Sequence, residues 1–148
     1  MPDFHRLAEH VAETLDIGPG TRVFEVDCGD GEFLYPLYVN GYRVGGMDGD
    51  PAMIEKALAA MPEGLFTVGL ASALDPAAPW DVVVCWSLAG APDLDYARGV
   101  LARMFAKATH AIALLGVPEG RHQWVMHALA EAGAKAVQVE GNHIFARV

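Results

Sequence analysis

The residues of this chain that could do chemistry gather in the segment EVDCGDG, residues 25–31. A buried strand is expected at residues 22–26 and helical spacing follows the segment, so it forms a turn between a strand and a helix. Such a turn places free backbone N–H groups and the positive end of a helix at the carboxyl edge of the strand. Because Gly29 and Gly31 carry no side chain, a ligand can approach the main chain there. The segment predicts a ligand-binding turn.

The carboxylates around this turn indicate what kind of ligand it takes. Asp48 falls at the end of the next expected strand, where a carboxylate can accept both hydroxyls of a ribose. A dinucleotide site would have the spacing Gly-x-Gly-x-x-Gly, but the third position here is Leu34. Glu25, Asp27 and Asp30 would oppose a pyrophosphate and favour an ammonium or sulfonium group. A cationic nucleoside ligand is therefore favoured over the nicotinamide cofactor of an oxidoreductase.

Apolar periodicity places the turn in an α/β fold. Strands are expected at residues 22–26, 43–47, 65–68, 81–86, 110–115, 136–139 and 143–146, and helices around residues 7–15, 33–38, 51–61, 100–105 and 123–132. This alternation predicts one Rossmann-like, doubly wound domain over residues 1–148, with a mostly parallel sheet and an antiparallel hairpin at its C-terminal end. Pro36 should make the second helix begin late or kink. The inner face of the third helix is expected to be Ile54, Ala57, Leu58 and Met61.

Composition bounds the class of protein. Hydrophobic residues make up 53% of the chain and charged residues 20%, which is typical of a folded domain and not of a disordered chain. The longest apolar runs, such as residues 111–115, have the length of a strand, so no transmembrane helix is expected. The first five residues show neither a cationic nor an apolar leader region, and two cysteines make no disulfide framework, so we expect a cytoplasmic location.

The charge is strongly acidic and uneven. The formal net charge is −9, and such a chain is expected to repel a phosphate backbone, which predicts that nucleic acid is not a partner. Residues 1–95 carry 16 acidic and 4 basic side chains, whereas residues 96–148 carry 3 and 6. An acidic first half suits a cationic ligand such as a sulfonium, and the alternative is an acidic surface that water solvates.

With these motifs in place, the chain resembles the class I S-adenosylmethionine-dependent methyltransferases, specifically their small-molecule group. Residues 23–34 match the pattern V-hydrophobic-E-V-x-C-G-x-G-x-x-L, and residues 46–54 match G-hydrophobic-D-x-x-P-x-M-I. The strand at residues 81–88, which begins with aspartate, is similar to a later feature of the family. The resemblance spans essentially the whole chain, the terminal hairpin included, and implies a compact member with a minimal lid.

The resemblance implies a cofactor, S-adenosylmethionine, and methyl transfer to a small organic acceptor. Carried over by position, it implies that Glu25, Gly29 and Gly31 surround the methionine moiety of the cofactor. Asp48 would hold the ribose. A buried carboxylate needs a partner, which makes Glu25 and Asp48 hard to explain as packing alone. No residue is assigned as a metal ligand.

Two positions depart from the family pattern. Asp27 stands where the family usually has its first glycine, so its side chain either tightens an ammonium contact or blocks the site. Leu70 stands where the family tends to have an acidic residue that binds the adenine amino group. Adenine would then rely on backbone groups around Leu70 and Ala71, which weakens binding more readily than it abolishes it. Met47 and Met53 would pack near the adenosine, although Met53 on a helix is also suited to the core.

The acceptor side is less defined by the sequence. Methyl transfer from a sulfonium is an in-line displacement, so a general base is needed only if the acceptor must lose a proton. His122 is the candidate base because it follows the fifth strand at the edge where ligands bind. Trp86 either lines an acceptor pocket or packs as a core aromatic. Little chain precedes the first strand, which suggests an open pocket for a carrier-bound acceptor, or closure by a second subunit in a homodimer.

One further function fits the same residues. A methyltransferase-like fold could bind the cofactor or its product without catalysis, in a structural or regulatory role. The departures at Asp27 and Leu70 are the features that favour this alternative.

Overall fold

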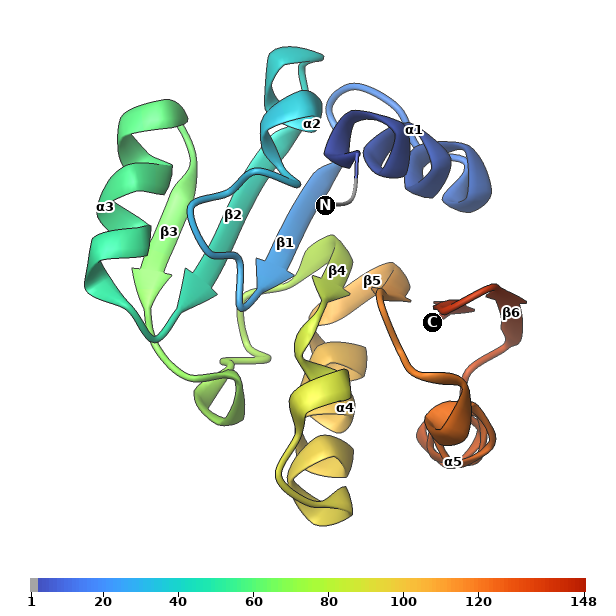
Figure 1. Ribbon diagram of the computed structural model, residues 1–148. Helices are drawn as coiled ribbons and strands as arrows, with labels where there is room; N and C mark the ends of the chain where they lie inside the picture. Colours follow the sequence, from blue (N-terminus) through green and yellow to red (C-terminus); the bar gives the residue numbers. More distant parts are fainter. Residues whose placement is uncertain (1–2) are drawn as a thin grey trace.

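Seven strands form one sheet in the computed structural model of the chain, which describes residues 3–148 apart from the side chains of Ser87 and Ala89 (Figure 1). The strands are β1 (Arg22–Val26), β2 (Arg43–Asp48), β3 (Leu65–Val68), β4 (Trp80–Cys85), β5 (Ala108–Leu114), β6 (Ala136–Glu140) and β7 (His143–Arg147). The helices are α1 (Phe4–Leu15), α2 (Tyr35–Val39), α3 (Pro51–Ala60), α4 (Leu94–Lys107) and α5 (Glu119–Ala132). Short 3₁₀ turns span Ala71–Ala73 and Ser87–Gly90.

The strand order is β3-β2-β1-β4-β5-β7-β6. The first five strands pair in parallel, whereas β7 pairs antiparallel with both β5 and β6. The chain winds outward from β1 in one direction and from β4 in the other, so the two strands flank the point where the order reverses. Open α/β sheets bind ligands outside the carboxyl ends of the strands at such a point. The expected doubly wound sheet with its terminal antiparallel hairpin is confirmed.

Helices cover both faces of the sheet: α1, α2 and α3 lie on one face, and α4 and α5 on the other (Figure 1). Side chains alternate between the faces along each strand, so Val82 and Val84 pack with the first group of helices and Val83 with the second. All three valines are fully buried, which explains why β4 reads as a continuous apolar run. None of the helices within residues 3–148 combines the length and the apolar character that a bilayer crossing requires.

The helices differ from the expectation in detail. Helix α2 begins late, at Tyr35, with Pro36 in its first positions, as the proline predicted. Helix α3 ends at Ala60, and its inner face buries Ile54 and Ala57, but Leu58 is exposed. Met61 follows the end of α3 and is nevertheless fully buried. Its burial agrees with the expected inner face, although the turn after the helix and not helical spacing directs this side chain.

Three of the aspartates in the first half of the chain cap the N-terminal ends of helices. Asp3, Asp50 and Asp93 are the N-caps of α1, α3 and α4, and each accepts a hydrogen bond from a backbone N–H of the first turn, at 3.2, 2.9 and 2.7 Å respectively. A side-chain oxygen at this position satisfies a donor that the helix itself leaves unpaired. These carboxylates are therefore accounted for by local structure, in contrast to those around the glycine turn.

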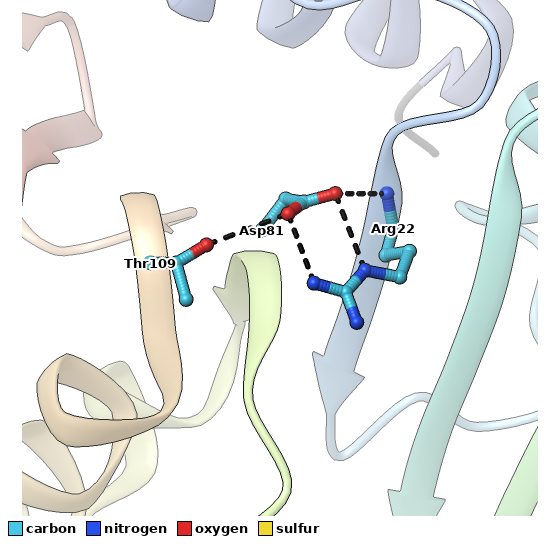
Figure 2. Close-up of polar contacts among 3 residues, drawn as sticks. All are labelled: Arg22, Asp81 and Thr109. Atoms are coloured by element: carbon cyan, nitrogen blue, oxygen red, sulfur yellow. Dashed lines mark hydrogen bonds and ion pairs between the residues drawn. The ribbon is translucent and has the colours of Figure 1, made fainter.

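Asp81 joins the beginnings of three central strands, at the edge of the sheet opposite the glycine turn (Figure 2). Its carboxylate accepts a hydrogen bond from the Arg22 backbone N–H at 2.8 Å, pairs with the Arg22 guanidinium at 3.2 Å, and accepts from the Thr109 hydroxyl at 3.4 Å. Partial burial alone would raise the pKa of Asp81, but the bonds from Arg22 and its charge lower it below the usual value. The carboxylate of Asp81 thus links the beginnings of β1, β4 and β5 (Figure 2).

Candidate functional site

A pocket of about 300 Å³ lies under the glycine turn, where β1 and β4 end. The residues that line it are Phe4, Glu25, Asp27, Cys28, Gly29, Asp30, Glu32, Phe33 and Trp86. Four of these are carboxylates and three are aromatic, and no lysine, arginine or histidine is among the described residues of the lining. Carboxylates and the faces of aromatic rings both attract cations. The lining therefore suits a ligand with positive charge.

Glu25 is the buried carboxylate at the base of this pocket. Only 2% of the residue is exposed, and its Oε1 atom has no hydrogen-bond partner. Burial raises the pKa of Glu25 well above its ordinary value, a hydrogen bond with the Trp86 side chain lowers it in part, and the charges of Asp27, Asp48 and Asp30 raise it further. A carboxylate buried without compensation is costly, so the group either keeps its proton or receives a cation.

The raised pKa makes a prediction for stability. In the absence of ligand, the folded protein binds the Glu25 proton more tightly than the unfolded chain does. The stabilisation is complete below the unfolded pKa, near 4.5, and is lost as the pH rises through the folded pKa. Glu25→Gln keeps the shape and removes the titration. The free energy of unfolding of the native chain should therefore fall relative to that of the variant by about 1.4 kcal/mol per pH unit between the two pKa values.

Urea unfolding of both proteins between pH 5 and pH 8 measures this difference. Glu63→Gln, which changes an exposed carboxylate away from the pocket, should leave the pH dependence as it is in the native chain. Parallel pH profiles for the native chain and Glu25→Gln would contradict the assignment of a raised pKa to Glu25.

The turn after β1 has an unusual backbone. Asp27, Gly29 and Gly31 have φ angles of +57°, +57° and +87°, in the left-handed region that glycine adopts freely. Aspartate is one of the few other residues that tolerate this conformation, which explains how Asp27 can stand in a position typical of glycine. A Cβ atom on Gly29 would meet nothing within 4 Å, whereas one on Gly31 would approach the Met61 methyl group to 2.3 Å. Gly29 thus leaves open space at the pocket, and Gly31 allows close packing of the turn on Met61.

Asp48 connects the end of β2 to the glycine turn. One carboxylate oxygen accepts a hydrogen bond from the Gly29 N–H at 2.9 Å, and the other accepts from the Asp50 N–H at 2.9 Å. A carboxylate has about four acceptor positions, so both oxygens can still accept from a further donor such as a hydroxyl. Asp48 therefore holds the turn in place and also presents acceptors at the same edge of the sheet.

The other residues expected around the adenosine lie in different environments. Met47 is buried in the core cluster that packs against α4 and α5, and Ala71 is buried in the same cluster. Met53 is partly buried in the first turn of α3. Leu70 is 63% exposed just after β3, and its side chain would lie 2.9 Å from a Cβ on Gly49, next to Asp48. The structure thus gathers Glu25, Asp27, Gly29 and Asp48 around the turn and leaves the methionines in or near the core.

An aromatic cover over Glu25 was only partly visible in the sequence. The Trp86 ring contacts Phe4 and Phe33 edge to face, with ring centroids 6.0 and 6.2 Å apart. Phe33 precedes α2 and does not belong to its face. Phe4 was missed, although it extends the apolar stripe of α1 by one turn, and that continuation was the available signal. The first turn of α1 therefore helps to close the pocket.

The histidines lie outside the lining of this pocket. His122 is partly buried in the first turn of α5, and its Nε2 lies 2.7 Å from the Val117 carbonyl oxygen. Because a carbonyl only accepts, Nε2 is the donor in this hydrogen bond. The Nδ1 atom of His143, at the start of β7, accepts a hydrogen bond from the Gly116 N–H at 3.2 Å. Burial lowers the pKa of His143, which keeps that acceptor available.

Comparison with known protein sequences gives partial matches. No protein-family model matches the chain. It is 35% identical over 54 residues to the 23S rRNA (uracil(1939)-C(5))-methyltransferase RlmD of Nitrosococcus oceani, a match that covers 36% of this chain and 12% of that protein. It is 34% identical over 71 residues to the uncharacterized methyltransferase sll0829 of Synechocystis, covering 48% of this chain and 32% of that protein. The matches thus span about a third or less of these relatives.

Comparison with solved structures covers nearly the whole chain. The chain superposes on CalS10 with bound SAM, an amino pentose methyltransferase from Micromonospora echinaspora, with a TM-score of 0.82 and 17% identity over 99% of this chain and 92% of that one. It superposes on magnesium protoporphyrin IX methyltransferase (ChlM) from Synechocystis, also with bound SAM, with a TM-score of 0.80 and 19% identity over 97% and 78%. These likenesses establish which fold the chain has.

One expectation is corrected by the sequence relatives. The net charge predicted that nucleic acid is excluded as a partner, but matching relatives include rRNA methyltransferases from two genera. The exclusion is therefore wrong. The physical reason is that these matches cover only 12% of each rRNA enzyme. The other parts of such a protein can make the contacts with RNA, so the net charge of the matching segment does not decide whether RNA is a partner. The expected carrier-bound acceptor and homodimer find no support in the comparisons either.

Proposed function

We propose that this chain, which has the fold of the class I S-adenosylmethionine-dependent methyltransferases, binds S-adenosylmethionine and transfers its methyl group to a small organic acceptor. The observation that carries the proposal is the buried Glu25 carboxyl, whose Oε1 atom lacks a partner in a pocket lined by three further carboxylates. S-adenosylmethionine brings an ammonium and a sulfonium group, and when bound it supplies an electrophilic methyl group.

The methionine part of the cofactor fits the pocket beneath the turn. Asp27 presents negative charge to a cationic ligand, Glu25 becomes a carboxylate when such a ligand binds, and the aromatic faces of Phe4, Phe33 and Trp86 exclude water from it. Excluding water strengthens each electrostatic contact made inside the pocket. Gly29 leaves the space that a side chain would take, and Gly31 allows the turn to pack closely on Met61. These residues bind and orient the ligand without a change in their own fold.

The nucleoside part is assigned to the neighbouring strand ends. Asp48 accepts from the ribose hydroxyls with the acceptor positions that the backbone bonds leave open. Leu70 and Ala71 offer backbone groups to the adenine, and the exposed Leu70 side chain covers its ring. Met47 and Met53 support this region from the core and from α3. Since no side-chain carboxylate meets the adenine amino group at Leu70, we expect modest affinity for the nucleoside.

The acceptor side is assigned to the ends of β4 and β5. His122, whose Nε2 lies 2.7 Å from the Val117 carbonyl oxygen, is the residue assigned to take a proton from an acceptor that must lose one. In-line displacement at the methyl carbon otherwise requires only alignment and the exclusion of water. The solved neighbours named above, an amino pentose methyltransferase and a porphyrin methyltransferase, support a small organic acceptor.

Calorimetry tests the cofactor and isotope transfer tests the acceptor. S-adenosylmethionine and its demethylated product should bind the chain with micromolar dissociation constants, and NAD should show no binding. With methyl-labelled cofactor, the label should appear in a deproteinised metabolite extract, and total RNA is incubated in parallel for comparison. Label in the RNA alone would overturn the small acceptor.

Two outcomes of these experiments would favour a different function for the chain. Binding of the cofactor without transfer to either extract would favour the non-catalytic role, structural or regulatory, that the departures at Asp27 and Leu70 allow. Binding of NAD alone would favour an oxidoreductase.

A further inference from the structure

The carboxyl groups of the pocket oppose one another's ionisation. Glu25, Asp27, Asp30 and Glu32 line it, Asp48 lies next to it, and its described lining offers no cationic side chain. Asp27, Asp30 and Asp48 all act on Glu25, and the nearby Cys28 thiol is held protonated because burial, and then Glu25 and its neighbours, raise its pKa to about 12. Like charges at such separations oppose further ionisation of the most buried member.

Glu25 is the member for which ionisation is most costly, because it is the most deeply buried. It is the only carboxyl of the lining that is nearly completely buried among the described residues, and its Oε1 atom has no partner, whereas Asp27 and Asp30 are partly exposed and Glu32 is exposed. The Trp86 side chain provides one hydrogen bond, which is too little to balance a full charge. A protonated Glu25 is expected to lose its proton only when a cation takes the place of that proton.

Asp27 adds a charge that makes the pocket favour a cationic ligand over a neutral one. The backbone of the turn requires a φ of +57° there, which glycine would meet without adding charge. Asp27 instead adds a carboxylate to the lining and raises the cost of ionising Glu25. A ligand with positive charge relieves that cost, and a ligand of zero net charge does not.

We propose that the pocket exchanges the proton on Glu25 for the positive charge of S-adenosylmethionine, and therefore binds the sulfonium form in preference to the neutral demethylated product. This inference rests on the proposed function. S-adenosylmethionine has one net positive charge, from a sulfonium, an ammonium and a carboxylate, and the product lacks the sulfonium. Binding of the cation with loss of the Glu25 proton leaves the charge of the site unchanged, whereas the product leaves the proton in place. Methyl transfer then converts a preferred ligand into a weaker one, which promotes product release.

Calorimetry of the full chain at pH 6 and pH 7, in buffers of different ionisation enthalpy, counts the protons. S-adenosylmethionine should release up to about one proton at the pH where Glu25 is still protonated, and the demethylated product should release much less. Sinefungin, with an amine in place of the sulfonium, should behave as the cation does. The cationic ligands should bind about tenfold or more tightly than the product. In Glu25→Gln the proton release should disappear.

A pair of aspartates supplies a matched control. Asp27→Asn keeps a residue suited to a positive φ but removes the charge, and it should reduce the preference for the cation over the product by about fivefold or more. Asp16 has a φ of +54° at the C-cap of α1, so Asp16→Asn makes the same change of residue, conformation and net charge outside the lining. That control should leave the preference as in the native chain.

The outcomes separate the inference from the function on which it rests. If neither the cofactor nor its product nor sinefungin binds, the proposed function fails. If all three bind with equal affinity and without proton release, cofactor binding stands and the exchange is overturned. Proton release that persists in Glu25→Gln would also overturn it.

Discussion

Asp48→Ala should lower the affinity for S-adenosylmethionine by about tenfold or more, because two charge-assisted hydrogen bonds to the ribose would be lost. The same change removes the bonds that the carboxylate accepts from the Gly29 and Asp50 N–H groups. The free energy of unfolding should therefore also fall, by about 1–3 kcal/mol. Calorimetry with the cofactor and urea unfolding without it measure the two effects separately.

A helix cap elsewhere distinguishes a binding effect from a loss of stability. Asp93 accepts a backbone hydrogen bond at the start of α4, and Asp93→Ala should cost about 1 kcal/mol of stability. It should not change cofactor affinity, because Asp93 does not line the pocket. Affinity that falls equally in both variants, or is unchanged in Asp48→Ala, would refute the ribose assignment.

Trp86→Ala should give the largest loss of stability, about 3 kcal/mol. The indole makes edge-to-face contacts with Phe4 and Phe33, and its hydrogen bond with Glu25 is the interaction that partly compensates the buried carboxyl. Trp86→Phe keeps an aromatic ring for the contacts and removes the N–H donor. It should cost about 1–3 kcal/mol, because the buried carboxyl loses that donor. Urea unfolding at pH 7 measures both variants.

Trp124 provides the matched substitution. Its indole nitrogen is buried without a hydrogen-bond partner, so Trp124→Phe removes a donor that bonds to nothing. The free energy of unfolding should change by less than about 0.5 kcal/mol or increase. The cost of Trp86→Phe should in turn shrink in a Glu25→Gln background, because the amide no longer places a titrating carboxyl beside the ring. Equal costs in both backgrounds would contradict coupling between Trp86 and Glu25.

The elements of the sheet could be predicted because each leaves a local signal. A fully apolar run such as β4 indicates a parallel strand buried on both faces, and a two-residue Gly-Asn turn indicates the hairpin of β6 and β7. Helix starts were less accurate: α5 begins at Glu119, four residues before the predicted position. The first turn of a helix is often polar and lacks the periodic signal.

The residues of the candidate site also fall into those that the sequence predicts and those that it does not. Glu25 and Asp48 were predicted because carboxylates at strand ends are chemically conspicuous, and the bond from the Gly29 N–H to Asp48 joins the turn after β1 to the end of β2. Leu58 was placed on the inner face of α3 and is exposed, and Phe4 was not placed at all. Both depend on how a helix rotates and docks, and packing against the rest of the chain decides that.

The sequence by itself determined the α/β alternation, the glycine turn after β1 and the carboxylates that surround it, because strand, turn and helix preferences act over a few neighbouring residues. Only the tertiary structure decided that Glu25 is buried with an unpartnered oxygen, that Phe4 and Trp86 close over it, and that Asp27 stands in a left-handed conformation beside it. The physical reason is that burial and the electrostatic coupling of carboxylates depend on distances through space. Residues 4, 25 and 86 come together only when α1, β1 and β4 pack into one fold.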